Sequence, residues 1–167
     1  KGFSTLIIAS QYGHADIVNL LLENKANVDL QNAGGATALI IAAKNGYADV
    51  VNALLSKGAK VDAQTTDGIT ALMLATQKGH ESIVDALLAK NANVNLQTKE
   101  KLTALMLAAL DGRTSIVDKL LARNAKIDVQ ASDNTTALYM AARNGHTAIV
   151  ETLLAKNAPV DLIAAND

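Results

Sequence analysis

Thr70-Ala71-Leu72-Met73-Leu74-Ala75 is the stretch that decides the fold, because it recurs along the chain at a fixed step. Related stretches begin 33 residues before it at Thr37, 33 residues after it at Thr103, and a further 33 residues on at Thr136. A shorter match, Thr5-Leu6-Ile7-Ile8-Ala9, lies near the N-terminus. A sustained period of this length predicts a repeat array. We therefore expect one array over residues 1–167, taken from a longer protein, with repeats at approximately 1–32, 33–65, 66–98, 99–131 and 132–167.

The composition favours thin helical layers and excludes several classes of partner. Half of the 167 residues are hydrophobic but only 2% are aromatic, so Ala, Leu, Ile and Val supply the apolar surface. The net charge of −1 disfavours nucleic acid as a partner. The absence of Cys excludes disulfides and thiolate sites. No apolar run approaches the roughly 20 residues of a membrane span, so we expect no membrane insertion.

Each repeat is predicted to contain two short helices. In the second repeat, Thr37 is a suitable N-cap for a helix over residues 38–44, and Asn45-Gly46 ends that helix. A second helix is predicted over residues 49–57, because its aliphatic side chains recur with helical spacing. Gly58 follows at a position where the backbone commonly turns left-handed.

The residues that follow the second helix predict a tight turn and a projecting hairpin. The position of Gly58 is occupied by Asn in three other copies but by Lys25 in the first, which should cost about 1–2 kcal/mol if the left-handed conformation is kept. Asp67-Gly68 then predicts a turn between two extended arms. The fold class is therefore expected to be all-α, a solenoid of helix-turn-helix units with projecting β-hairpins.

Three columns of identical residues run through the five copies and indicate how the repeats stack. An Ala that never varies implies packing too close for a larger side chain, as expected where equivalent helices of successive repeats meet. The columns are Leu6, Leu39, Leu72, Leu105 and Leu138; Ala9, Ala42, Ala75, Ala108 and Ala141; and Leu21, Leu54, Leu87, Leu120 and Leu153.

These features together resemble the ankyrin repeat. The resemblance rests on the 33-residue step, the Gly68-Ile69-Thr70-Ala71-Leu72 opening, the Gly79-His80 turn and the Ile83-Val84 start of the second helix. It covers essentially the whole chain. The family's usual Thr-Pro-Leu-His is replaced by Thr-Ala-Leu followed by an apolar or aromatic residue, so the polar His contact is missing. The resemblance implies a protein that binds other proteins through the concave side formed by hairpins and first helices, without chemistry of its own.

The residues capable of chemistry are better explained by structure than by catalysis. His14, His80 and His146 share one repeat position, and neighbouring His two repeats apart would lie about 20 Å from each other, too far to share a metal. We therefore expect turn residues at this position. The column Asp29, Asp62, Asn95, Asp128 and Asp161 predicts a repeated hydrogen-bonding position. We expect no enzyme, no metal site and no cofactor.

Information about a partner should lie where the copies differ while remaining exposed. Ile69, Leu102 and Leu110 predict an apolar centre on the concave face with a polar rim, which is the pattern of a docking site. The alternative is that these side chains pack hairpin against helix. The expected protein-binding residues are Tyr12, Lys44, Ile69, Gln77, Lys78, Leu102, Leu110, Asp111, Arg143 and Asn144.

A row of glutamines and the two ends of the array complete the predictions. Gln31, Gln64, Gln97 and Gln130 predict amide hydrogen bonds from repeat to repeat, with a polar recognition strip as the alternative. Terminal repeats normally carry a polar outer face, but the first and fifth copies keep the aliphatic pattern of the interior ones. We expect further repeats in the parent protein or end-to-end self-association.

The function expected from sequence is a non-catalytic protein-protein interaction scaffold with a protein or peptide partner. The alternative is a passive architectural spacer that positions a catalytic or membrane domain outside this segment. We expect an intracellular, cytoplasmic protein, with secretion into a host cell as the second possibility.

Overall fold

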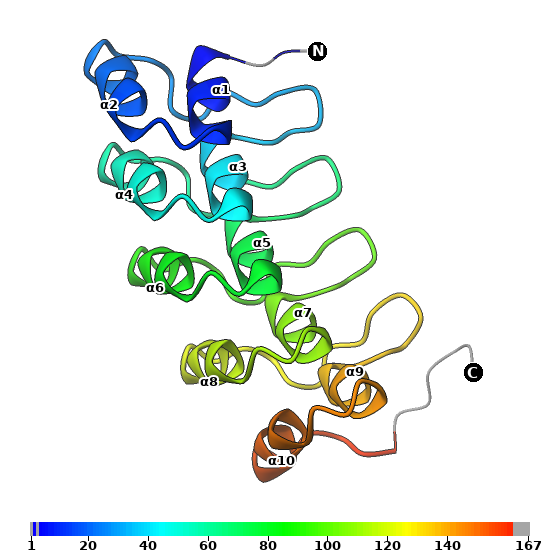
Figure 1. Cartoon of the computed structure of the whole chain (residues 1–167). Coiled ribbons are helices and arrows are strands. Elements are labelled where there is room, and N and C mark those ends of the chain that lie inside the picture. Colours follow the sequence, from blue (N-terminus) through cyan, green and yellow to red (C-terminus); the bar gives the residue numbers. More distant parts are fainter. Residues whose placement is uncertain (1, 3, 162–167) are drawn as a thin grey trace. The chain divides into compact units, whose positions relative to one another are not determined.

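The structure is a computed structural model that describes residues 2 and 4–161 (Figure 1). The described residues form ten helices, two for each predicted repeat. The chain divides into two compact units, residues 1–93 with six helices and residues 94–167 with four. The helices of the first unit are α1 (Thr5–Gln11), α2 (Ala15–Glu23), α3 (Ala38–Asn45), α4 (Ala48–Ser56), α5 (Ala71–Lys78) and α6 (Glu81–Ala89). Those of the second unit are α7 (Ala104–Leu110), α8 (Thr114–Ala122), α9 (Ala137–Arg143) and α10 (Thr147–Ala155).

Each unit has two rows of helices. In the first unit the first helices α1, α3 and α5 pack in one row, and the second helices α2, α4 and α6 pack in the other (Figure 1). In the second unit α7 packs against α9 and α8 against α10. Within every repeat the first helix contacts the second. This is the stacked arrangement of helix pairs that the repeat period predicts.

The first helix of each repeat begins at a hydroxyl cap. The side chains of Thr37, Thr70, Thr103 and Thr136 each accept a hydrogen bond from the backbone N–H three residues on, at 3.2 or 3.3 Å. Such a bond satisfies one of the free donors of the first turn. The cap predicted at Thr37 is therefore confirmed, and the three later copies share it. In the first copy the cap is Ser4, and Thr5 is already the first helical residue.

The second helices begin and end close to the predicted residues. In the second repeat the helix runs over Ala48–Ser56, one residue earlier at each end than predicted. Gly58 follows with φ +81°, and the N–H groups of Gly58 and Ala59 donate to the carbonyls of Leu55 and Leu54. This pair of bonds satisfies carbonyls at the end of the helix. Lys25 keeps the same left-handed conformation, with φ 62°, despite its side chain.

The loops between repeats double back as hairpins, but no strand is found in residues 2 and 4–161. The prediction of β-hairpins was therefore wrong in its β component. In the loop after α2, Asn32 donates its N–H to the carbonyl of Ala36 and accepts from Gly35, and these bonds close a turn without starting a ladder. Neighbouring loops instead bond to each other, with Thr66 N–H donating to the Gly34 carbonyl at 2.9 Å.

The invariant columns form the core between the helix rows. Leu39, Leu72 and Leu105 are buried, and the alanines of the first helices are buried in all five copies. Where an alanine faces the neighbouring helix row, a larger side chain would force the helices apart. The stacking role predicted for these columns is confirmed. Leu21 and Leu138, which belong to the first and last copies, remain half-buried.

Candidate functional site

The ten residues predicted to bind a partner lie on first helices, just beyond their ends, or in the loops that precede them. All ten are exposed or half-buried. Ile69 belongs to the first unit, whereas Leu102 and Leu110 belong to the second. Their grouping into one apolar centre therefore stays a prediction, and each unit is described by itself below.

The first unit carries a groove of about 220 Å³ between the end of α1, the loop that precedes α3, and α3 itself. Ile41 is half-buried in it and supplies an apolar surface, and Lys44 lies exposed at its edge. The side-chain amide of Asn45 donates to the Gln11 carbonyl at 3.0 Å and so joins the ends of two first helices. On the loop side, Asn32 Oδ1 accepts from two backbone N–H groups of its own loop, which fixes that wall. The groove thus combines an aliphatic floor with fixed polar walls.

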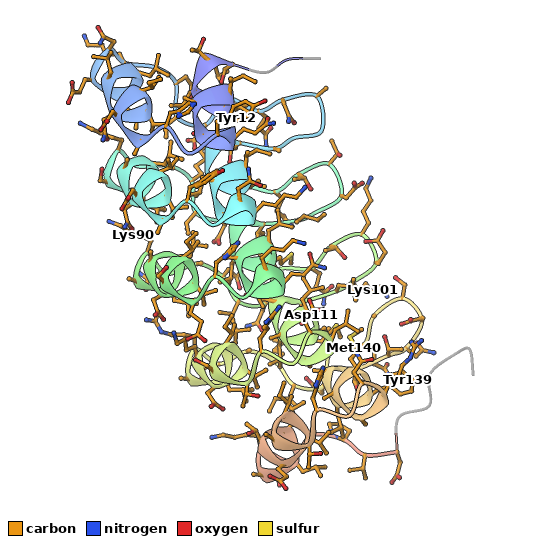
Figure 2. All side chains as sticks on the ribbon, in the orientation of Figure 1. Tyr12, Lys90, Lys101, Asp111, Tyr139 and Met140 are labelled. Carbon is orange, nitrogen blue, oxygen red and sulfur yellow. The ribbon has the colours of Figure 1, made fainter. Side chains whose placement is uncertain are left out.

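Tyr12 stands just beyond the end of α1 in the same unit (Figure 2). Its side chain is 60% exposed, and its ring stacks on His14 with the ring centroids 6.1 Å apart. An exposed aromatic ring that is already held by a neighbour loses little freedom on binding, which suits it as an anchor.

The second unit carries a groove of about 300 Å³ between two neighbouring loops. Leu102 and Ala131 provide its apolar lining, and Glu100 and Asp133 lie at its edges. The Ser132 N–H donates to the Glu100 carbonyl at 2.9 Å and ties the two loops together. Leu102 was predicted as part of an apolar centre with a polar rim, and in this groove Glu100 lies beside it.

Asp133 keeps its charge down to low pH. The Thr135 hydroxyl donates to Asp133 Oδ1 at 2.6 Å and the Thr135 N–H donates to the same oxygen at 3.0 Å. These bonds, with the hydroxyl bond the larger cause, lower the pKa of the Asp133 carboxyl below its usual value of 3.8, and Arg143 adds a smaller effect in the same direction. The rim of the groove is therefore anionic at neutral pH.

Hydrogen bonds between copies tie each repeat to the next. Oδ1 of Asp29 accepts from the Lys60 N–H, 31 residues on, at 2.9 Å. Asp62 and Asn95 accept in the same way from the residues 31 positions after them. The structural role predicted for this column is confirmed at these three positions. The glutamine ladder is confirmed at one step, where Gln31 Nε2 donates to the Gln64 carbonyl at 3.2 Å.

The comparison with known families agrees with this geometry. The family model described as ankyrin repeats, three copies, matches residues 6–98 and again residues 72–164. The chain belongs to the ankyrin repeat family. Ankyrin repeats are in general protein-protein interaction modules and are typically not catalytic. No curated protein matches the chain at a significant level. In the described part of the array, no helix has the length and apolar character that a membrane crossing requires.

The histidines of these ankyrin repeats lie in the turns between helices, as predicted. His80 and His146 directly precede α6 and α10. His80 Nε2 lies 3.3 Å from the Lys44 carbonyl, and His146 Nε2 lies 3.1 Å from the Leu110 carbonyl, so each ring bonds to the preceding repeat. Among the described residues, no group of three or more His, Cys, Asp or Glu side chains could hold a metal ion.

Sequence reasoning missed one apolar column on the first helices of the ankyrin repeats. Ile8, Ile41 and Leu74 in the first unit lie two residues after the invariant buried leucine, and none of the three is buried. A step of two residues rotates a helical side chain by about 200°, away from the core. That rotation was the signal that could have identified the column, but its residues are apolar in every copy and were therefore assigned to the core.

Proposed function

We propose that this ankyrin array is a non-catalytic scaffold that binds a protein or peptide on the surface formed by its first helices and inter-repeat loops. The observation that carries the proposal is the difference in burial between the invariant and the varying positions of each repeat. Positions identical in every copy are buried, apart from the half-buried Leu21 and Leu138, whereas several positions that differ between copies are exposed or half-buried and line grooves. Two grooves, one in each unit, contain residues expected from sequence to contact a partner, namely Lys44 and Leu102.

The grooves suit aliphatic or aromatic side chains of a partner. Ile41 in the first unit and Leu102 in the second supply apolar contact, and charged or amide groups surround each of them. An apolar centre with a polar rim is the usual anatomy of a protein-binding patch. Tyr12 adds an exposed aromatic ring beside the first groove. We propose the cytoplasm as the location of the protein.

The competing function is a passive spacer that positions another domain. The two functions differ in what they require of the exposed residues, because a spacer needs only the buried columns. A second class of protein partner, another copy of this chain, would be bound at the ends of the array and not on the groove surface.

A photo-crosslinking experiment separates a binding scaffold from a spacer. A photoreactive amino acid is placed at Tyr12 or at Leu102, and as matched controls at Ser82 and Asp118, which lie exposed on second helices. The groove-surface proposal expects one protein to be captured from the first two positions and not from the controls. That protein, once purified, should bind the wild-type chain saturably and bind Leu102→Asp or Lys44→Glu at least tenfold more weakly.

Two results would contradict the proposal. Capture with equal yield at all four positions would show that the captured protein does not prefer the groove surface to the second helices. Unchanged affinity of the purified partner for both groove variants, with unaltered circular dichroism, would remove these grooves from the interface and favour the spacer.

A further inference from the structure

The outer side of the first repeat exposes two aliphatic side chains, one of which has buried counterparts in the other repeats. Ile17 on α2 is 47% exposed, whereas the residues at its position in the later copies are at most 1% exposed. These residues are Val50, Ile83, Ile116 and Ile149. Leu20, also on α2, is 60% exposed, and the later copies carry Ala, Lys or Thr at its position. The outer side of α1 and α2, here called the head face, therefore exposes apolar side chains.

The outer side of the last repeat contains an apolar groove of about 280 Å³. Its lining comes from α9, α10 and the segment that follows, and includes Leu138, Tyr139, Val150, Leu154 and Val160. Leu154 is 42% exposed, whereas at the same repeat position Leu22, Leu55 and Leu88 are 3–8% exposed and Leu121 is half-buried. Figure 2 shows Tyr139 on α9. We call this surface the tail face.

The chain itself shows what covers such surfaces. In the first unit α1 packs against α3 and α2 against α4, and Val50 on α4 and Leu22 on α2 are both buried there. The same pairs recur in the second unit, where α7 packs against α9 and α8 against α10. Ile17 corresponds to Val50, and Leu154 corresponds to Leu22. The head and tail faces are thus the two sides of one interface that the array already forms between its own repeats.

We propose that the tail face binds the head face of a second copy of this chain, so that copies associate head to tail. The new junction continues the established repeat-to-repeat interface and covers Ile17 and Leu154 as Val50 and Leu22 are covered. A dimer formed by contact between two different faces still has one free head face and one free tail face, so further copies can add to it. Association should therefore proceed beyond the dimer as concentration rises.

Variants blocked at one face provide the test. Ile17→Lys with Leu20→Lys blocks the head face, and Leu154→Lys with Val160→Lys blocks the tail face, in all cases at exposed positions. Asn52→Lys with Ser82→Lys adds the same charge on the internal second helices α4 and α6 and serves as the control. Sedimentation velocity is measured over about a hundredfold range of concentration, since association depends on protomer concentration. Circular dichroism checks that every variant is folded.

Head-to-tail association has a distinctive outcome in this design. The wild-type chain and the control should form dimers, trimers and larger species as concentration rises. Each blocked variant alone should stay monomeric, because its copies lack one of the two faces, while an equimolar mixture of the two should form a one-to-one dimer and nothing larger. A monomeric wild type across the whole range overturns the proposal. A dimer formed by either blocked variant alone overturns it as well, since two like faces would then be in contact.

Discussion

Gly112 and Gly145 occupy the same position in consecutive repeats of the second unit but have different surroundings. Both adopt left-handed backbone conformations, with φ +68° and +73°. A Cβ built on Gly112 would stand 2.6 Å from Cε1 of the His146 ring, whereas one on Gly145 meets no described atom within 4 Å. Substituting alanine at both positions therefore separates the conformational cost from the cost of disturbing the contact between repeats.

The two substitutions should lower the free energy of unfolding by different amounts, and the difference should equal about the contribution of one inter-repeat contact. Alanine at a left-handed position costs about 1 kcal/mol after the gain from a less flexible unfolded chain, and we expect this loss for Gly145→Ala. Gly112→Ala carries the same cost and also displaces the His146 ring, which breaks the bond between Nε2 and the Leu110 carbonyl. Loss of a hydrogen bond adds about 0.5–1.5 kcal/mol. We expect Gly112→Ala to lose about 2 kcal/mol in total.

Urea unfolding followed by circular dichroism measures both losses. The curves are fitted with a nearest-neighbour treatment, because a repeat array can depart from two-state behaviour. Adding His146→Ala to each variant closes a double-mutant cycle. In chains that carry His146→Ala, Gly112→Ala and Gly145→Ala should lower the free energy of unfolding by the same amount. Equal losses for the two alanine variants with His146 in place would refute the idea that this ring packs on Gly112.

The remaining predictions concern single side chains. Thr76→Val should stabilise the fold by about 1 kcal/mol, because the buried Thr76 hydroxyl has no hydrogen-bond partner among the described residues. Thr70→Val, at the N-cap of the same helix, should destabilise the fold by about 1 kcal/mol through loss of the capping bond. Thermal unfolding compares the two variants. Lys25→Gly should raise stability by about 0.5–1 kcal/mol in urea unfolding, because it removes a strained left-handed conformation, and a loss of stability would contradict this. Thr135→Val should raise the pKa of Asp133, measured by NMR titration, because the hydroxyl bond that lowers it is removed. The pKa of Asp133 in the folded state lies below the usual value of 3.8. The contribution of this carboxylate to stability is therefore present above pH 3.8 and is lost as the pH falls through the folded-state pKa. Asp133→Asn should remove this pH dependence of stability.

The fold could be predicted because its determinants are local and repeated. A hydroxyl before an aliphatic run identifies a helix start in every copy, and Thr70 shows the expected bond to the third residue of the helix. The second helix was misplaced by one residue because Tyr47, at its start, makes no side-chain capping bond and so leaves no sequence signal. Strands were predicted from the turn residues alone. The loops instead direct bonds sideways to the next loop, as from Thr66 to Gly34, which a pattern within one loop does not contain.

The candidate site was predicted only in part, because grooves depend on how neighbouring repeats meet. Leu102 and Lys44 were identified because they stand at positions that vary between copies, and the structure leaves Lys44 exposed and Leu102 half-buried. Ile41 was missed because its column is apolar in every copy, although the structure places it in a groove. Ala131 and Leu102 line the same groove from loops about 30 residues apart, and a 33-residue period does not specify which side chains of adjacent loops converge.

The position after the first helix shows that variation between copies is not by itself a sign of binding. Asn45 and Asn144 each use a side-chain N–H to bond the carbonyl 34 residues earlier, so in these copies the side chain holds neighbouring repeats together. Tyr12, Lys78 and Asp111 stand at the corresponding position in the other copies, and none of them has a side-chain amide. Stacking of the repeats therefore tolerates different residues at this position. A side chain that replaces asparagine does not make the amide bond, and we expect it to contact a partner instead. Specificity for a partner should accordingly rest on the tyrosine, lysine and aspartate copies, and the asparagine copies should affect stability more than binding.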